Sequence, residues 1–75
     1  MDKVIFLIEK SQYRREMVEN LTRKELEDWV SEENYDDDNT IVKIDANDYD
    51  SVDDALNGEV MWCDLDDYYV FVFGF

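Results

Sequence analysis

The side chains of this chain that could take part in chemistry are almost all carboxylates. The sequence contains 21 Asp and Glu residues, a single cysteine and no histidine. Histidine is the commonest general base and a frequent metal ligand, so its absence excludes Ser–His and Cys–His catalytic pairs. Cys63 has no basic neighbour in sequence, and the adjacent Asp64 disfavours a reactive thiolate. The two glycines form no phosphate-binding loop, and we therefore expect a protein that is not an enzyme and binds no cofactor.

The acidic run at residues 36–40 is the best candidate for a metal site. It places oxygen ligands at alternate positions, as the start of an EF-hand loop does. That motif also requires Gly at loop position six and Glu at position twelve. Counted from Asp36, these positions are Ile41 and Asn47, and a frame that starts at Asp45 fails in the same way. We therefore predict no dedicated metal site.

The charge of the chain is large and unevenly distributed. Residues 1–24 contain six basic and four acidic side chains, whereas the remaining 51 residues contain 17 acids and one base, Lys43. The two parts therefore carry +2 and −16, and the whole chain carries −14. Such a charge opposes folding by self-repulsion and attracts cationic surfaces over long distances. It excludes direct binding to nucleic acid or to an anionic membrane surface, because each phosphate contact needs a cation. We predict instead a basic partner protein, one that itself binds nucleic acid.

The acids come mainly from predicted loops and turns, and after residue 33 they are nearly all Asp. A short side chain fixes a charge pattern with little loss of rotamer entropy on binding, which favours mimicry of nucleic acid. If the loops cluster, their charge density approaches that of duplex DNA, with one charge per about 1.7 Å of axis. The predicted partner-binding residues are Asp28, Glu32, Asp36, Asp37, Asp38, Asp45, Asp48, Asp50, Asp53, Asp54, Asp64, Asp66 and Asp67.

Other interpretations of the charge and of the aromatic residues stay open. The acids could serve solubility alone, with the basic residues of the first segment pairing with them. Alternatively, a mixed aromatic and acidic face containing Trp62, Tyr68 or Phe75 could neutralise a basic partner, as an adaptor or antitoxin-like protein does. A chain that ends on phenylalanine within a strand also leaves an edge through which a homodimer could form.

Length and composition predict a single folded domain over residues 1–75. Apolar residues make up 45% of the chain and aromatic residues 15%, which is unlike a disordered acidic chain. A single cysteine excludes an internal disulfide and is typical of a reducing compartment. No stretch resembles a signal peptide or approaches the ~20 apolar residues of a membrane span. We therefore expect a cytoplasmic protein.

The hydrophobic patterns predict three or four strands. Residues 4–8 form a β-branched and aromatic run that is typical of a strand buried on both faces. Residues 40–46 predict a second strand, and residues 59–63 a third. In the last predicted strand, aromatic residues alternate with smaller ones, and we expect Phe71 and Phe73 to join the core against Leu26 and Trp29.

Helix signals are clear at two places and ambiguous at a third. Thr22 and Glu25 form a capping box, which predicts a helix over residues 23–32. Ser51 can cap a short helix over residues 52–57, with Gly58 as its C′ residue. Residues 12–20 fit either a helix capped by Ser11 or a hairpin strand.

These elements predict an α+β fold: a small mixed sheet of three to four strands, with one main helix and one short helix on one face. In size, charge and Asp-rich loops, the chain resembles the small acidic proteins with which phages and mobile elements block restriction enzymes or CRISPR effectors by mimicking DNA. The resemblance rests on no sequence motif and assigns no roles to single residues. It implies an inhibitor that occupies a DNA-binding surface of host defence or other DNA-handling machinery.

Overall fold

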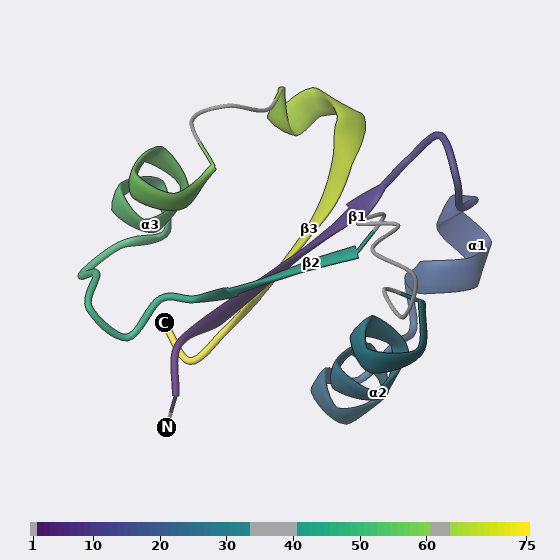
Figure 1. Cartoon of the computed structure of the whole chain (residues 1–75), viewed down its shortest axis with the longest axis horizontal. Coiled ribbons are helices and arrows are strands. Elements are labelled where there is room, and N and C mark those ends of the chain that lie inside the picture. Colours follow the sequence, from purple (N-terminus) through teal and green to yellow (C-terminus); the bar gives the residue numbers. More distant parts are fainter. Residues whose placement is uncertain (1, 34–40, 61–63) are drawn as a thin grey trace.

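A computed structural model describes residues 2–33, 41–60 and 64–75, and it confirms an α+β fold (Figure 1). Within these residues the sheet has three strands in the order β2-β1-β3, namely β1 (Val4–Glu9), β2 (Ile41–Asp45) and β3 (Tyr68–Phe73). Both outer strands run antiparallel to β1. The prediction of a mixed sheet was therefore wrong for the described strands. β2 and β3 do run in the same direction, but β1 separates them.

The central strand β1 is buried on both faces, as predicted. The side chains of its first five residues are at most 2% exposed. Ile5 and Leu7 point to one side of the sheet, where they pack with Ile44 and Leu56. The alternate residues of β1, which include Phe6, belong to a second cluster on the opposite side. Because successive strand residues face opposite sides, this one apolar run contributes side chains to two cores.

The helices therefore cover both faces of the sheet, and the prediction that they share one face was wrong. Helices α1 (Arg15–Val18) and α2 (Arg23–Glu33) cover one face, and α3 (Val52–Glu59) covers the other (Figure 1). The reason is the double burial of β1, because a strand that is apolar on both faces must be covered on both. None of the helices in the described ranges is both long and apolar enough to cross a membrane.

Helix α2 begins at the predicted capping box. The backbone N–H of Glu25 donates to Thr22 Oγ1 at 3.2 Å, and the N–H of Thr22 donates to Glu25 Oε1 at 3.3 Å. Leu26 is fully buried, and Trp29 is partly buried against the same core. Phe71 and Phe73 of β3 join this cluster, as predicted.

The ambiguous segment before α2 contains a helix of one turn, α1. Its N-cap is Arg14, which makes no side-chain cap bond, so Ser11 is not the cap. Val18 is buried in the core under α2, whereas Met17 is 55% exposed. Of the two alternatives left open for residues 12–20, the structure therefore has the helix, which covers only Arg15–Val18.

Helix α3 is capped as predicted but continues further. The N–H of Asp54 donates to Ser51 Oγ at 3.2 Å. The helix runs through Gly58 to Glu59, and Val60 is its C-cap, so Gly58 is not a C′ glycine. The predicted strand over residues 59–63 is wrong for its first two residues, and residues 61–63 lie outside the described part.

The role of Gly58 is to make room for the ring of Tyr49. A Cβ atom at Gly58 would lie 2.5 Å from Tyr49 Oη and 2.8 Å from Tyr49 Cε1. The absence of a side chain at this position therefore lets the ring lie directly on the helix backbone. Sequence pattern assigned this glycine to the helix end because nothing local to residues 52–60 signals the approaching ring.

We expect Gly58→Ala to destabilise the protein, although alanine is the better helix former by about 1 kcal/mol. The added methyl would displace the ring of Tyr49, and such overpacking typically costs about 1–3 kcal/mol. The free energy of unfolding in urea measures the effect. Asn57→Ala, at an exposed position of the same helix, is the control and should be neutral or mildly stabilising. Equal effects of the two variants would contradict the role assigned to Gly58.

Candidate functional site

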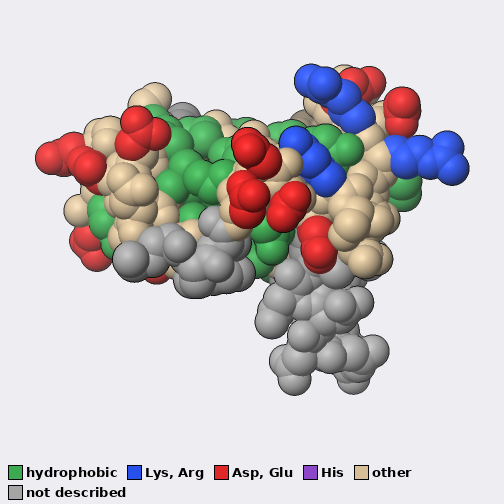
Figure 2. Space-filling model, turned by 90° about the horizontal axis from the view of Figure 1, so that it is seen from above, with side chains coloured by type: hydrophobic (Ala, Val, Ile, Leu, Met, Phe, Trp, Pro, Cys, Tyr) green, Lys and Arg blue, Asp and Glu red, His purple; other side chains and the backbone are tan. Residues whose placement is uncertain are grey.

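Seven of the predicted partner-binding acids come from the segments that form or flank α3 and from the short 3-10 helix η1 (Leu65–Asp67). All seven side chains are exposed. Seen along the view of Figure 2, acidic side chains gather over the α3 half and the middle of the molecule. We call this set the α3 acidic surface: Asp48, Asp50, Asp53, Asp54, Asp64, Asp66 and Asp67.

Helix caps and core contacts hold the two helical parts of this surface. Ser51 caps α3, which places Asp53 and Asp54 in its first turn, where the helix dipole favours negative charge. Asp64 caps η1 by accepting the backbone N–H of Asp66 at 3.0 Å. Leu65 of η1 packs against the same core cluster as α3. The apolar side chains therefore bring two acidic segments to one side of the sheet.

Tyr49 connects the loop that carries Asp48 and Asp50 to α3 and to the start of the chain through two hydrogen bonds. Its hydroxyl donates to Glu59 Oε1 at 3.0 Å, and its carbonyl oxygen accepts from Lys3 Nζ at 2.9 Å. The hydrogen bond to Glu59 raises the pKa of the Tyr49 phenol, and burial adds to the shift. Sequence reasoning missed both Tyr49 and Lys3 because the contact between them spans 46 positions, and no local pattern signals it.

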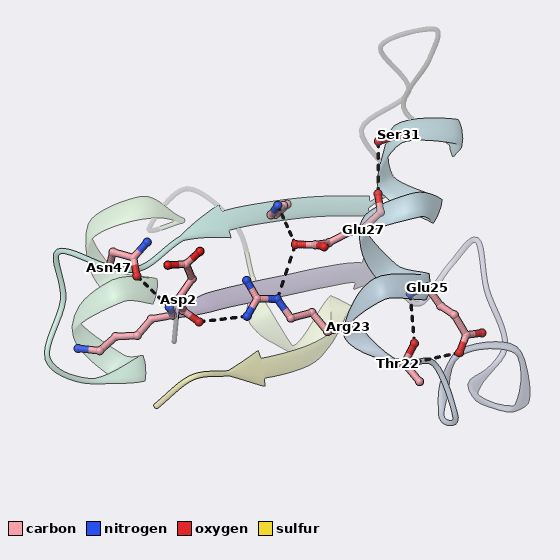
Figure 3. A network of polar contacts seen from close by, with 9 residues as sticks. Asp2, Thr22, Arg23, Glu25, Glu27, Ser31 and Asn47 are labelled. Carbon is pink, nitrogen blue, oxygen red and sulfur yellow. Dashed lines mark hydrogen bonds and ion pairs between the residues drawn. The ribbon is translucent and has the colours of Figure 1, made fainter.

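The basic side chains that make ion pairs lie on the other face of the sheet (Figure 3). Glu27 of α2 lies 3.1 Å from Lys43 Nζ and 3.6 Å from Arg23 Nε. The hydrogen bond from Lys43 lowers the pKa of Glu27. Arg23 also donates through Nη1 to the carbonyl oxygen of Asp2 at 3.2 Å. These contacts are exposed, so each contributes little stability, but they do use two of the seven cations of the chain.

Two predicted acids lie apart from the α3 acidic surface. Asp45 lines a hollow of about 150 Å³ together with Arg23 and Lys43, and it accepts a 2.8 Å hydrogen bond from Asn47 Nδ2. Asp28 lies on α2 beside Trp29, at the rim of another hollow. The side chains of Glu32, Asp36, Asp37 and Asp38 lie outside the described residues.

The α3 acidic surface is not neutralised from within the described part of the chain. Every ion pair between described residues involves Glu27. In the view of Figure 2, Lys and Arg side chains gather at the end of the molecule opposite α3. Lys10 lies beside η1, since its backbone N–H donates to the Asp67 carbonyl oxygen at 2.9 Å, and its ammonium lies 5.7 Å from the centre of the Tyr69 ring. No three acidic side chains of the described residues come close enough to hold a metal ion. The surface therefore presents separated charges to the solvent rather than a chelating cluster.

The Tyr49–Glu59 contact predicts a pH-dependent change. We expect Tyr49 to ionise above the usual tyrosine value of about 10, because the neutral phenol donates to Glu59. A pKa raised in the folded state stabilises the fold fully below the unfolded-state value, and this stabilisation is lost as pH rises through the folded-state value. Ultraviolet titration of the wild type minus Tyr49→Phe isolates this phenol. In Glu59→Gln the same midpoint should fall, and an unchanged midpoint would contradict the assigned cause.

Comparison of the chain with models of protein families, with curated proteins and with solved structures gave no match. What the α3 acidic surface does must therefore be inferred from its own geometry and charge.

Proposed function

We propose that this protein is an acidic binding protein that occupies a basic, nucleic-acid-binding surface of a partner protein. It would act as a DNA mimic that inhibits host defence or other DNA-handling machinery, without catalysing a reaction, in the cytoplasm of a cell that carries a phage or mobile element. The observation that carries the proposal is the α3 acidic surface, whose seven exposed carboxylates have no Lys or Arg partner within the described residues.

Two of the few cations of the chain pair with an acid on the face of the sheet opposite the α3 acidic surface. An acidic surface that served only to keep the chain soluble would gain stability by placing Lys and Arg among its carboxylates. Lys43 and Arg23 instead pair with Glu27 on the other face, so no ion pair between described residues neutralises a carboxylate of the α3 acidic surface. The field of such a surface accelerates encounters with a cationic groove, and it weakens as salt is added.

Local structure also favours a fixed pattern of charge over a mobile one. The acids of α3 and η1 lie on short side chains, and both helices begin at a side-chain cap. Little rotamer or backbone freedom remains to be lost when a partner binds, so more of the electrostatic attraction contributes to affinity.

The proposal is tested with immobilised protein and proteins eluted from duplex-DNA beads, taken from cells that carry the gene. We expect capture that is lost at high salt and reversed by added duplex DNA, because DNA and the α3 acidic surface would compete for one groove. Captured proteins that ignore both salt and DNA, or no capture at all, would contradict the proposal.

The matched variants remove two charges from opposite faces. Asp53→Asn with Asp66→Asn should weaken binding of a captured protein by about tenfold or more at low salt, since each close charge pair contributes up to about 1 kcal/mol in water. Glu16→Gln in α1 with Glu19→Gln at its C-cap changes the net charge equally and should have little effect. Titration calorimetry at two salt concentrations measures both variants. Equal losses would mean that net charge alone, rather than the α3 acidic surface, drives binding.

A second candidate is an acidic adaptor or antitoxin-like protein that binds through a mixed aromatic and acidic face. Phe75 favours it, because its ring is 45% exposed and lies 5.6 Å from Lys3 Nζ. Tyr68 is half-buried against the core, and Trp62 lies outside the described residues. In this case Phe75→Ala should cost more affinity than any single carboxylate, as aromatic hot spots do. A smaller loss than that of Asp53→Asn would exclude this face.

A further inference from the structure

Strand β3 is an outer strand of the described sheet, in a highly charged protein. It pairs with β1 on one side and with no described strand on the other. None of its six residues is charged, whereas the other outer strand, β2, carries Lys43 and Asp45. Proteins usually protect such edges with charged residues, because an open edge pairs with other strands. The absence of charge from β3 therefore points to a strand that pairs with another strand along its outer edge.

The face of β3 that lies on the α3 side is also apolar and uncovered. Val70 and Val72 are 41% and 38% exposed, although their partners on β1, Leu7 and Ile5, are fully buried. The core under α3 is built around β1 and β2, so the helix leaves the two valines exposed. On the opposite face, which α1 and α2 cover, a hollow of about 280 Å³ opens beside the strand, between Val18 of α1 and Tyr69 and Phe71 of β3. Helix α1 therefore does not fill the space at this edge.

The strand is complementary to itself. When an antiparallel copy continues the same sheet, paired residues must face the same side, so the sum of their two numbers must be even. A two-fold axis at Phe71 satisfies this rule and places Val70 opposite Val72 of the second copy. It also places Tyr69 opposite Phe73 of that copy. In this register, each of the two exposed valines packs beside an exposed valine of the second copy, and symmetry gives two such pairs.

Charged residues flank β3 at both of its ends and are compatible with the same register. The axis at Phe71 brings Asp67, at the end of η1, level with Phe75 of the second copy. The ammonium of Lys3 lies 5.6 Å from the centre of that ring. Lys10 also lies at the Asp67 end, where its backbone N–H donates to the Asp67 carbonyl oxygen at 2.9 Å. The register therefore sets an end with one acid and one base against the end that carries Lys3, and symmetry repeats this arrangement. The net charge of −14 on each copy opposes the association over longer distances.

We propose that two copies of this chain pair antiparallel through β3, centred on Phe71, to form a continuous six-stranded sheet. A two-fold axis perpendicular to the sheet keeps α3 of both copies on one face. The dimer therefore presents two α3 acidic surfaces side by side. This inference does not depend on the proposed function, because the chain alone provides the interface.

The dependence on salt distinguishes this association from binding to a basic partner. Screening reduces the repulsion between two negative copies, so dimerisation should strengthen as salt is added. Binding to a cationic groove should weaken under the same conditions. Sedimentation equilibrium of the purified full chain, at low and at high salt, measures the monomer–dimer equilibrium. A monomer at all salt and protein concentrations accessible to sedimentation would overturn the proposal.

Lysine substitutions at the edge test the surface. Val70→Lys with Val72→Lys should weaken dimerisation by at least about tenfold, because two charges would be buried against each other across the new strand pair. Net charge alone predicts stronger dimerisation of this variant, because each copy becomes less negative. Met17→Lys with Asn57→Lys makes the same change in charge at exposed positions elsewhere and should dimerise at least as well as the wild type. Equal dimerisation of the two variants would overturn the assigned surface.

Cysteine cross-linking tests the register, with Cys63 replaced by serine. A mixture of Val70→Cys and Val72→Cys chains should form a disulfide between unlike chains under mild oxidation, since these positions lie opposite each other. Each variant by itself should cross-link far less. Efficient cross-linking of Val70→Cys alone would place the axis at residue 70 and would overturn the register that we assign.

Discussion

The fold depends on the double burial of β1. Its five consecutive apolar residues put side chains on both faces of the sheet, and neither set can remain in water. A chain of 75 residues must therefore build two thin cores rather than one thick one. As a result, α2 and α3 each cover one of the two cores. Leu26 of α2 closes one core and Leu56 of α3 closes the other. With so little apolar material on each side, β3 remains only partly covered.

The two layers of helices also separate the charges. The face under α2 contains the ion pairs of Glu27 with Lys43 and Arg23, close to the basic first third of the chain. The α3 side receives acids from three successive segments, and Lys3 and Lys10 lie at its margins, where they contact Tyr49 and the Asp67 backbone. Self-repulsion on that side opposes folding and is reduced by salt. The caps of α3 and η1 offset part of this cost, because helix N-termini stabilise nearby carboxylates.

Much of the local structure was predictable because its causes lie within a few residues. The capping box of Thr22 and Glu25, the cap at Ser51 and the burial of β1 all follow from short patterns, and all three are confirmed. The acidic segments were also predictable as exposed, because ionised carboxylates are rarely buried without partners. Their use in binding a partner remains a proposal.

The errors share one cause, which is contact between residues distant in sequence. Gly58 has the local context of a helix end, yet Tyr49 determines its role by lying across the helix. The placement of α3 opposite α2 depends on which side of β1 each helix reaches, and periodicity within a helix contains no such information. The same limit applies to Asp45 and Asp28, which belong to the acidic set by sequence but lie apart from the α3 acidic surface.

The sequence by itself determined the α+β class, the central strand, the caps of the two longer helices and the excess of negative charge. These features depend on local hydrogen bonding, on side-chain periodicity and on composition. Only the tertiary structure decided that the sheet is antiparallel, that helices cover both of its faces, and that seven acids gather around α3 and η1 while the paired cations lie on the other face. The physical reason is that packing around β1 orients each segment, and packing is a property of the whole chain.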